Sequence, residues 1–138
     1  MDDKVELLRR VPLFATLESP DLSAVARIAK VVDVPAGTVL THEGRHEGYF
    51  FVVVTGSVRI DRAGVTVNTL GDGDFLGEIA LLDGGARTAT ATAVSDCRLL
   101  QVTNEQFDEL LTTTPSVRAA IMTEVGRRLR RIDEEAVH

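Results

Sequence analysis

Two opposite charges stand nine residues apart in GEIALLDGGARTATATA, residues 77–93, a stretch made mainly of small, apolar and glycine residues. The two are Glu78 and Arg87. Arginine presents a planar, permanently charged guanidinium that can hold two phosphate oxygens at once. The run EIAL is long enough for one helical turn, whose free backbone N–H groups suit an anion, and Gly77 would let a ligand approach that backbone closely. The pattern therefore indicates a site for a phosphate-bearing ligand.

The glutamate narrows the kind of ligand. A carboxylate beside a phosphate would repel it unless the carboxylate faces a neutral donor, and a ribose 2′-hydroxyl is such a donor. In a 3′,5′-cyclic nucleotide this is the only free ribose hydroxyl, so one arginine and one glutamate match that ligand in number and kind. The alternative reading is an ordinary surface ion pair between Glu78 and Arg87, since such pairs are common and weak.

Helical patterns lie at the two ends of the chain. Residues 4–10 and 19–32 read as helices, the second with Ser19 as its cap and Pro20 at its first helical position. Near the other end, TNEQFDELLTT opens with Thr103 and has a glutamine three residues later, which is a capping box. A last helix is predicted from Pro115, with an apolar stripe on one face: Val117, Ile121, Val125, Leu129 and Ile132.

The middle of the chain has a different character. Short runs rich in valine, threonine and aromatic residues alternate with glycines: TVLT, YFFVVV, SVRID, VTVNTL, RTATATAV and CRLLQVT. Short strands at this spacing predict an antiparallel sandwich or barrel. We therefore expect a mainly β single domain over residues 1–138, with N-terminal helices in 1–31, a β-barrel in 32–103 and C-terminal helices in 104–138.

Composition excludes several classes of protein. A chain of 138 residues fits one domain, and the lone Cys97 provides neither a disulfide nor a metal framework, which suits a reducing compartment. A net charge of −6 argues against a nucleic-acid surface, and no apolar run reaches the length of a membrane helix. We expect a cytoplasmic domain without direct nucleic-acid or membrane binding.

HEGRH, residues 42–46, matches the zinc-protease pattern HExxH literally. That chemistry needs a helix to point both histidines one way, whereas glycines surround this motif and β-type runs flank it. Neither a nucleophile elbow nor a His–Asp set is evident. The sequence thus predicts a polar loop at residues 42–46, no metal site, no cofactor and no catalytic activity.

The stretch from Gly77 closely resembles the phosphate-binding cassette of cyclic nucleotide-binding domains, as found in protein kinase A regulatory subunits, cyclic-nucleotide-gated channels and catabolite activator proteins. Here the cassette reads GEIAL, then LDGGA, then RTAT. LLRRVPLFATLESPDLSAVA, VPAGTVLTHEG, YFFVVVTGSVRI and CRLLQVTNEQFDELL resemble the family's flanking segments. One departure is Ala86, where many members carry proline before the arginine. The resemblance implies a jelly-roll β-barrel with N-terminal helices and C-terminal lid helices.

The resemblance also implies roles for single residues. Arg87 would hold the cyclic phosphate and Glu78 the ribose 2′-hydroxyl. The other implied contacts are backbone groups of Gly77, Ile79 and Ala80, the phosphate neighbours Thr88 and Ala89, and the base-lining side chains Leu76 and Val67. For these last two, membership of the plain hydrophobic core is the competing interpretation.

Two functions remain open on this basis. The first is a cyclic nucleotide sensor that binds cAMP best and cGMP measurably. The second is a domain that kept the fold, lost the ligand and serves as an interaction or dimerisation unit. In the family the last helix closes over the base or pairs with its twin, which implies a homodimer or an unknown effector as partner; Arg128 and Arg131 are its candidate lid contacts. The sequence leaves open whether the chain is part of a longer protein.

Overall fold

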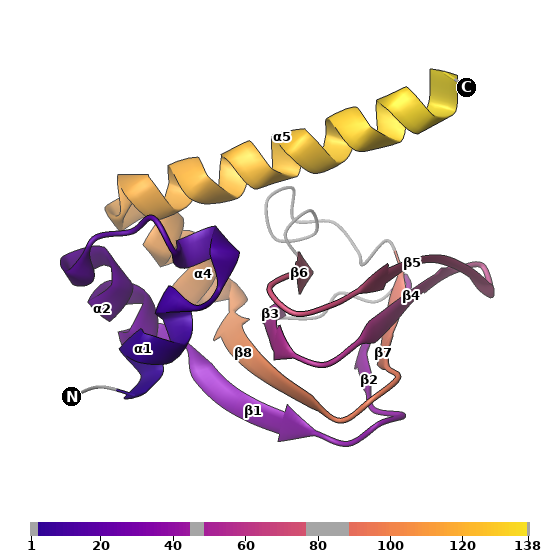
Figure 1. Cartoon of the computed structure of the whole chain (residues 1–138), viewed down its shortest axis with the longest axis horizontal. Helices are drawn as coiled ribbons and strands as arrows, with labels where there is room; N and C mark the ends of the chain where they lie inside the picture. Colours follow the sequence, from indigo (N-terminus) through magenta and orange to yellow (C-terminus); the bar gives the residue numbers. More distant parts are fainter. Residues whose placement is uncertain (1–2, 45–48, 77–88, 138) are drawn as a thin grey trace.

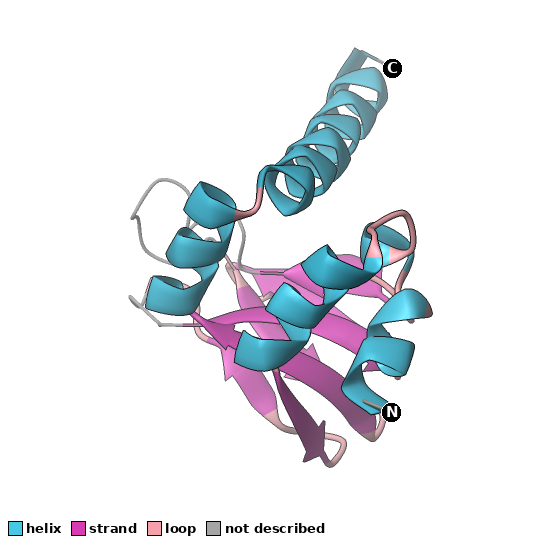
Figure 2. Ribbon diagram, turned by 90° about the vertical axis from the view of Figure 1, so that its left-hand side faces the viewer, coloured by secondary structure: helices cyan, strands magenta, loops and turns pink. Residues whose placement is uncertain are grey.

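The structure is a computed structural model that describes residues 3–44, 49–76 and 89–137, the residues from 128 onward by their backbone alone. In this part of the chain, eight strands form two four-stranded antiparallel sheets, and helices cover one of them (Figures 1 and 2). The helices are α1 (Asp3–Arg9), the 3-10 helix η1 (Pro12–Phe14), α2 (Ser19–Ile28), α4 (Asn104–Thr113) and α5 (Pro115–Val137). The strands are β1 (Lys30–Val34), β2 (Val39–Thr41), β3 (Tyr49–Thr55), β4 (Val58–Arg62), β5 (Val65–Leu70), β6 (Phe75–Leu76), β7 (Thr90–Ala93) and β8 (Cys97–Thr103).

The strand order is β1-β8-β3-β6 in one sheet and β2-β7-β4-β5 in the other. Two facing sheets of this kind are the double-sheet form of a jelly roll. The predicted mainly β fold with flanking helices is therefore confirmed. The sheets stay open, however, so the expected barrel is a sandwich of two sheets.

In the sheet β1-β8-β3-β6 the two central strands, β8 and β3, are buried on both of their faces, as β3 illustrates. Successive side chains of a strand point to opposite faces. Phe50 and Val52 belong to the core cluster that packs against the helices, whereas Phe51 and Val53 belong to the cluster shared with the other sheet. A strand buried on both faces reads as a continuous apolar run, which explains the run YFFVVV.

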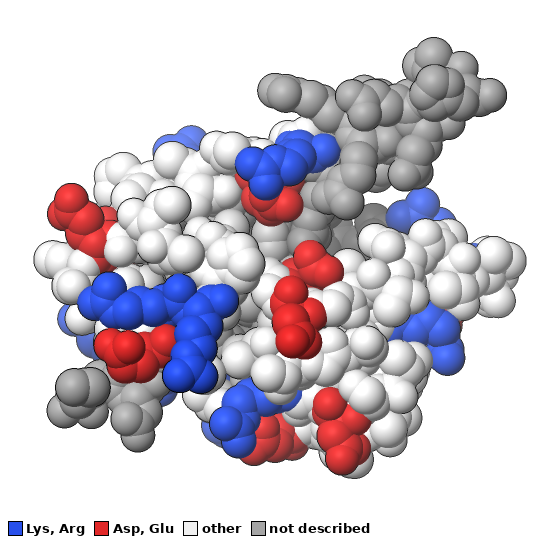
Figure 3. All heavy atoms as spheres, viewed as in Figure 1, with Lys and Arg blue, Asp and Glu red and all other residues white. Residues whose placement is uncertain are grey.

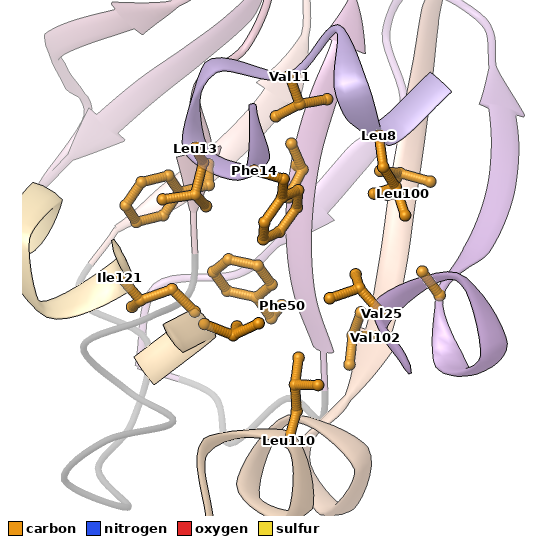
Figure 4. Close-up of a cluster of buried hydrophobic side chains, with 14 of the residues drawn as sticks. Leu8, Val11, Leu13, Phe14, Val25, Phe50, Leu100, Val102, Leu110 and Ile121 are labelled. Atoms are coloured by element: carbon orange, nitrogen blue, oxygen red, sulfur yellow. The ribbon is translucent and has the colours of Figure 1, made fainter. Parts of the chain in front are cut away.

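The helical core is organised around Phe50 (Figure 4). Its ring stacks on that of Phe107 in α4 at 4.6 Å between centroids, and it lies 5.7 Å from the ring of Phe75 in β6. Side chains from every helix complete this cluster, including Leu8, Val11, Phe14, Val25, Leu110, Val117 and Ile121.

Helix α5 packs through its first half. Val117 and Ile121 are buried in the helical core and Val125 packs against it partly buried, which confirms this part of the predicted stripe. The side chains of Leu129 and Ile132, like those of Arg128 and Arg131, lie outside the described part. The far end of the helix projects away from the sheets (Figures 1 and 2).

The two predicted helix caps have different outcomes. The capping box is confirmed, since Thr103 Oγ1 accepts from Gln106 N–H at 3.2 Å and Gln106 Oε1 accepts from Thr103 N–H at 3.3 Å. The cap at Ser19 is wrong. Helix α2 has Glu18 at its N-cap with no side-chain cap bond, and Ser19 Oγ accepts instead from Arg9 Nη2 at 2.9 Å.

The expected boundary between helix and sheet is also wrong. Helix α2 ends at Ile28 and β1 begins at Lys30, so the helix predicted to Val32 is too long. The valines of β1 pair with β8, for example Val31 with Leu100, and this long-range pairing outweighs the helical spacing of the sequence.

Gly56, in the turn between β3 and β4, has a φ of +119°. A Cβ at this position would lie 2.5 Å from Cys97 Sγ and 2.8 Å from the carbonyl oxygen of Asp96. We expect Gly56→Ala to lower the free energy of unfolding by about 2–3 kcal/mol, because it combines backbone strain with a clash against β8. Urea denaturation measures this loss.

Gly37→Ala is the matched control, since Gly37 has a φ of +92° but nothing within 4 Å of the place that a Cβ would occupy. It should cost only the conformational strain, about 1 kcal/mol. Equal losses in the two variants would show that the close approach of this turn to β8 is not a constraint on the fold.

Candidate functional site

The predicted site residues Gly77, Glu78, Ile79, Ala80, Arg87 and Thr88 lie outside the described residues, but both ends of their segment are defined. Before it, β6 pairs with β3 through Phe51–Leu76 and Val52–Phe75. After it, β7 pairs with β4, beginning at Asp61–Thr90. Because β6 and β7 belong to different sheets, residues 77–89 connect the two layers of the sandwich.

The two residues before this segment are buried, one in the core under the helices and one in the core between the sheets. Phe75 is 1% exposed in the helical core, and Leu76, which is 7% exposed, belongs to the cluster between the sheets. Leu76 thus packs in the hydrophobic core, and its contact with a base stays a prediction. Sequence reasoning missed β6, because a two-residue strand carries no periodic signal.

The end of the segment is held by β2. Ala89 is half-buried, and its carbonyl accepts a hydrogen bond from the Thr41 hydroxyl at 3.2 Å. Thr90 Oγ1 accepts from the backbone N–H of Glu43 at 3.0 Å. Sequence reasoning missed Thr41 and Glu43, because contacts over more than 40 positions leave no local pattern.

Val67 differs from Leu76 in sheet and in burial. It is on β5 in the other sheet, 53% exposed, at the point where the pairing with β4 shifts register between Ile60 and Asp61. Val67 is thus exposed to solvent, whereas Leu76 packs in the core.

The neighbouring strand β4 carries a second arginine, Arg59, which is already paired. Its Nε lies 2.9 Å from Asp61 Oδ2, and the hydroxyl of Thr66 donates to Asp61 Oδ1 at 2.7 Å. The hydrogen bond from Thr66, together with that from Arg59, lowers the pKa of Asp61. Arg59 would have to leave Asp61 in order to bind a phosphate, so it is a poor candidate for a phosphate contact.

The described part of the chain also contains two grooves, and neither is lined by Val67, Leu76 or Ala89. One, of about 850 Å³, lies between α1–η1 and the ends of β1, β3 and β8. The other, of about 600 Å³, lies between η1, residues 72–75 and the first half of α5. On the face shown in Figure 3, acidic and basic side chains lie beside one another. Arg98 pairs with Asp33, and Arg127 pairs with Glu124.

The HExxH motif does not lie on a helix at its described end. Strand β2 ends at Thr41, and residues 42–44 form an irregular segment and a turn, while His46 is outside the described residues. Among the residues that the structure describes, no group of three potential metal ligands comes together. Within the same residues, no helix has the length and apolar character that a membrane crossing requires.

Comparison with known proteins shows which family has this sequence and fold. The family model described as "Cyclic nucleotide-binding domain" matches residues 31–114. The chain is 34% identical to a cyclic nucleotide-gated potassium channel of Rhizobium etli over 116 residues, which are 84% of this chain and 32% of the channel. It is 25% identical over 131 residues to the CRP-like cAMP-activated global transcriptional regulator of Mycobacterium tuberculosis, covering 91% of this chain and 58% of the regulator.

Among solved structures, the catabolite activator protein of Thermus thermophilus matches with a TM-score of 0.80 and 32% identity, over 91% of this chain and 61% of that protein. The chain therefore spans less than two thirds of each of these three proteins. The family match runs from β1 to the residue after α4 and includes the whole connection 77–89. As the resemblance of that connection predicts, the chain belongs to the cyclic nucleotide-binding domain family.

Proposed function

We propose that the chain is a regulatory module that binds a cyclic nucleotide, cAMP best and cGMP less tightly, without catalytic activity of its own. The observation that carries the proposal is that the family match includes residues 77–89, whose ends are fixed in two facing sheets. The name of the Mycobacterium tuberculosis relative, which describes it as cAMP-activated, favours cAMP as the ligand.

In this proposal a few groups of the chain contact the phosphate, the ribose and the base of the nucleotide. Arg87 neutralises the single negative charge of the cyclic phosphate, and Glu78 accepts from the ribose 2′-hydroxyl. Backbone groups of Gly77, Ile79 and Ala80 contact phosphate and ribose, and Thr88 and Ala89 lie beside the phosphate. Val67, exposed on β5, packs against the base.

The partners follow from α5. This helix spans Pro115–Val137, and its first half covers the helical core while its far end projects from the body (Figure 1). A bound nucleotide that contacts the helix in only one state would bias its position. We propose that the projecting half meets a second copy of the chain or an effector in the cytoplasm.

The role of Arg87 is tested against that of Arg59. Arg87→Ala should weaken cAMP binding at least a hundredfold, because the phosphate loses its charged, bidentate partner, which corresponds to about 3 kcal/mol. Arg59→Ala also removes an arginine side chain, but from β4, where Arg59 is paired with Asp61. This variant should keep its affinity for cAMP within about twofold of the parent. Isothermal titration of both variants and the parent measures the difference.

Two results would count against the proposal. If Arg87→Ala binds cAMP as well as the parent does, residues 77–89 do not form the phosphate site. If neither cAMP nor cGMP binds to the parent, the chain is the alternative, a domain that kept the fold and acts through protein contacts.

Base selectivity is tested at Thr88. In the family, a hydroxyl after the arginine is associated with tolerance of cGMP, because it can reach both the phosphate and the guanine amino group of a syn base. We expect Thr88→Ala to weaken cGMP binding about fivefold more than cAMP binding, the equivalent of one hydrogen bond. Competition binding with both nucleotides measures the ratio, and equal losses would remove Thr88 from any role in selectivity.

A further inference from the structure

Thr41 is a buried polar residue whose hydroxyl has a specific partner. Its exposed fraction is 3%, and Thr41 and Thr114 are the two buried polar residues among those that the structure describes. The hydroxyl donates to the carbonyl of Ala89 at 3.2 Å, across 48 positions of the chain. Ala89 is the last residue of the connection 77–89 and the one residue of it that the structure describes.

The two buried threonines lie in different surroundings, Thr114 at a junction of two helices and Thr41 in a strand. Thr114 lies between α4 and α5, where its N–H donates to Leu110 O and its carbonyl accepts from Val117 and Arg118. Thr41 instead lies in a strand with Ala91 opposite, where a valine would fill the same space. Burial of a hydroxyl costs free energy unless it is hydrogen-bonded, so the contact with Ala89 accounts for a threonine at this position.

Glu43, two positions after Thr41, makes two further hydrogen bonds that join β2 to neighbouring segments. Its backbone N–H donates to Thr90 Oγ1 at 3.0 Å, and its Oε1 accepts from the N–H of Ala63 at 2.9 Å. Ala63 lies in the tight turn between β4 and β5, with a φ of +52°. The residues at the end of β2 thus link the C-terminal end of the connection 77–89 to the β4–β5 hairpin, which carries Val67.

We propose that Thr41 is a positioning residue for the nucleotide site, acting through the Ala89 carbonyl. The inference rests on the proposed function, since its object is the binding of a cyclic nucleotide near Arg87. Ala89 lies two positions after Arg87, and two residues of chain span at most about 7 Å, so a fixed Ala89 carbonyl limits where the backbone of Arg87 can lie. A backbone that is fixed before the ligand arrives also loses less freedom on binding.

Two substitutions separate the hydroxyl from the shape of the side chain. Thr41→Val keeps the shape and loses the donor, so the Kd for cAMP should rise about fivefold, the equivalent of one hydrogen bond. Thr41→Ser keeps the donor and loses a buried methyl, so it should lower the urea midpoint while the Kd stays within about twofold of the parent. Titration of the full chain under conditions where each variant is folded gives these values.

Thr38→Val is the matched control, because the Thr38 hydroxyl also donates to a backbone carbonyl, that of Pro35 at 2.8 Å, but at the other end of β2. It should bind cAMP like the parent. If Thr41→Val also binds like the parent, or if Thr41→Ser is weakened as much as Thr41→Val, Thr41 has no positioning role while the proposed function stands. If the parent itself does not bind cAMP, the proposed function fails and this inference fails with it.

Discussion

The burial of the central strands β3 and β8 on both of their faces is the constraint from which the other features follow. These strands direct Phe50, Val52, Leu100 and Val102 to the helices and Phe51, Val53 and Leu99 to the second sheet. Burial of apolar surface stabilises the fold by about 25 cal/mol per Å², so exposing either face of these strands would lower the free energy of unfolding. The helices and the second sheet are therefore held in place by the same strands.

This arrangement has a direct consequence for the candidate site. Strand β6 lies at the edge of the sheet β1-β8-β3-β6, and β7 lies within the second sheet. The chain between them has to cross from one layer to the other, and its ends are held by Phe75 and Leu76 on one side and by Thr41 and Glu43 on the other. The fold thus fixes both ends of this connection in the two sheets, and connections held by a fixed scaffold are where binding residues commonly occur.

Features encoded in neighbouring residues could be predicted from the sequence. The capping box joins Thr103 and Gln106, which are three positions apart. The continuous apolar run YFFVVV indicates by itself a strand that is buried on both faces. Features that depend on distant partners could not. The first residues of β1 continue the helical spacing of α2, and only their pairing with β8 makes them a strand; Thr41 carries no local signal because its partner Ala89 is 48 positions away. The burial of Leu76 also required the structure, since an exposed and a buried leucine look alike in sequence.

The most direct test of the central claim is an NMR titration of the full chain with cAMP, followed through the backbone amide signals. If the connection between the sheets binds the nucleotide, the largest shifts will be at residues 77–90 and on β5 around Val67, with saturation at one nucleotide per chain. Shifts confined to the groove between α1–η1 and β8, at Arg10, Asp72 and Asp96, or no shifts at millimolar cAMP, would contradict the account.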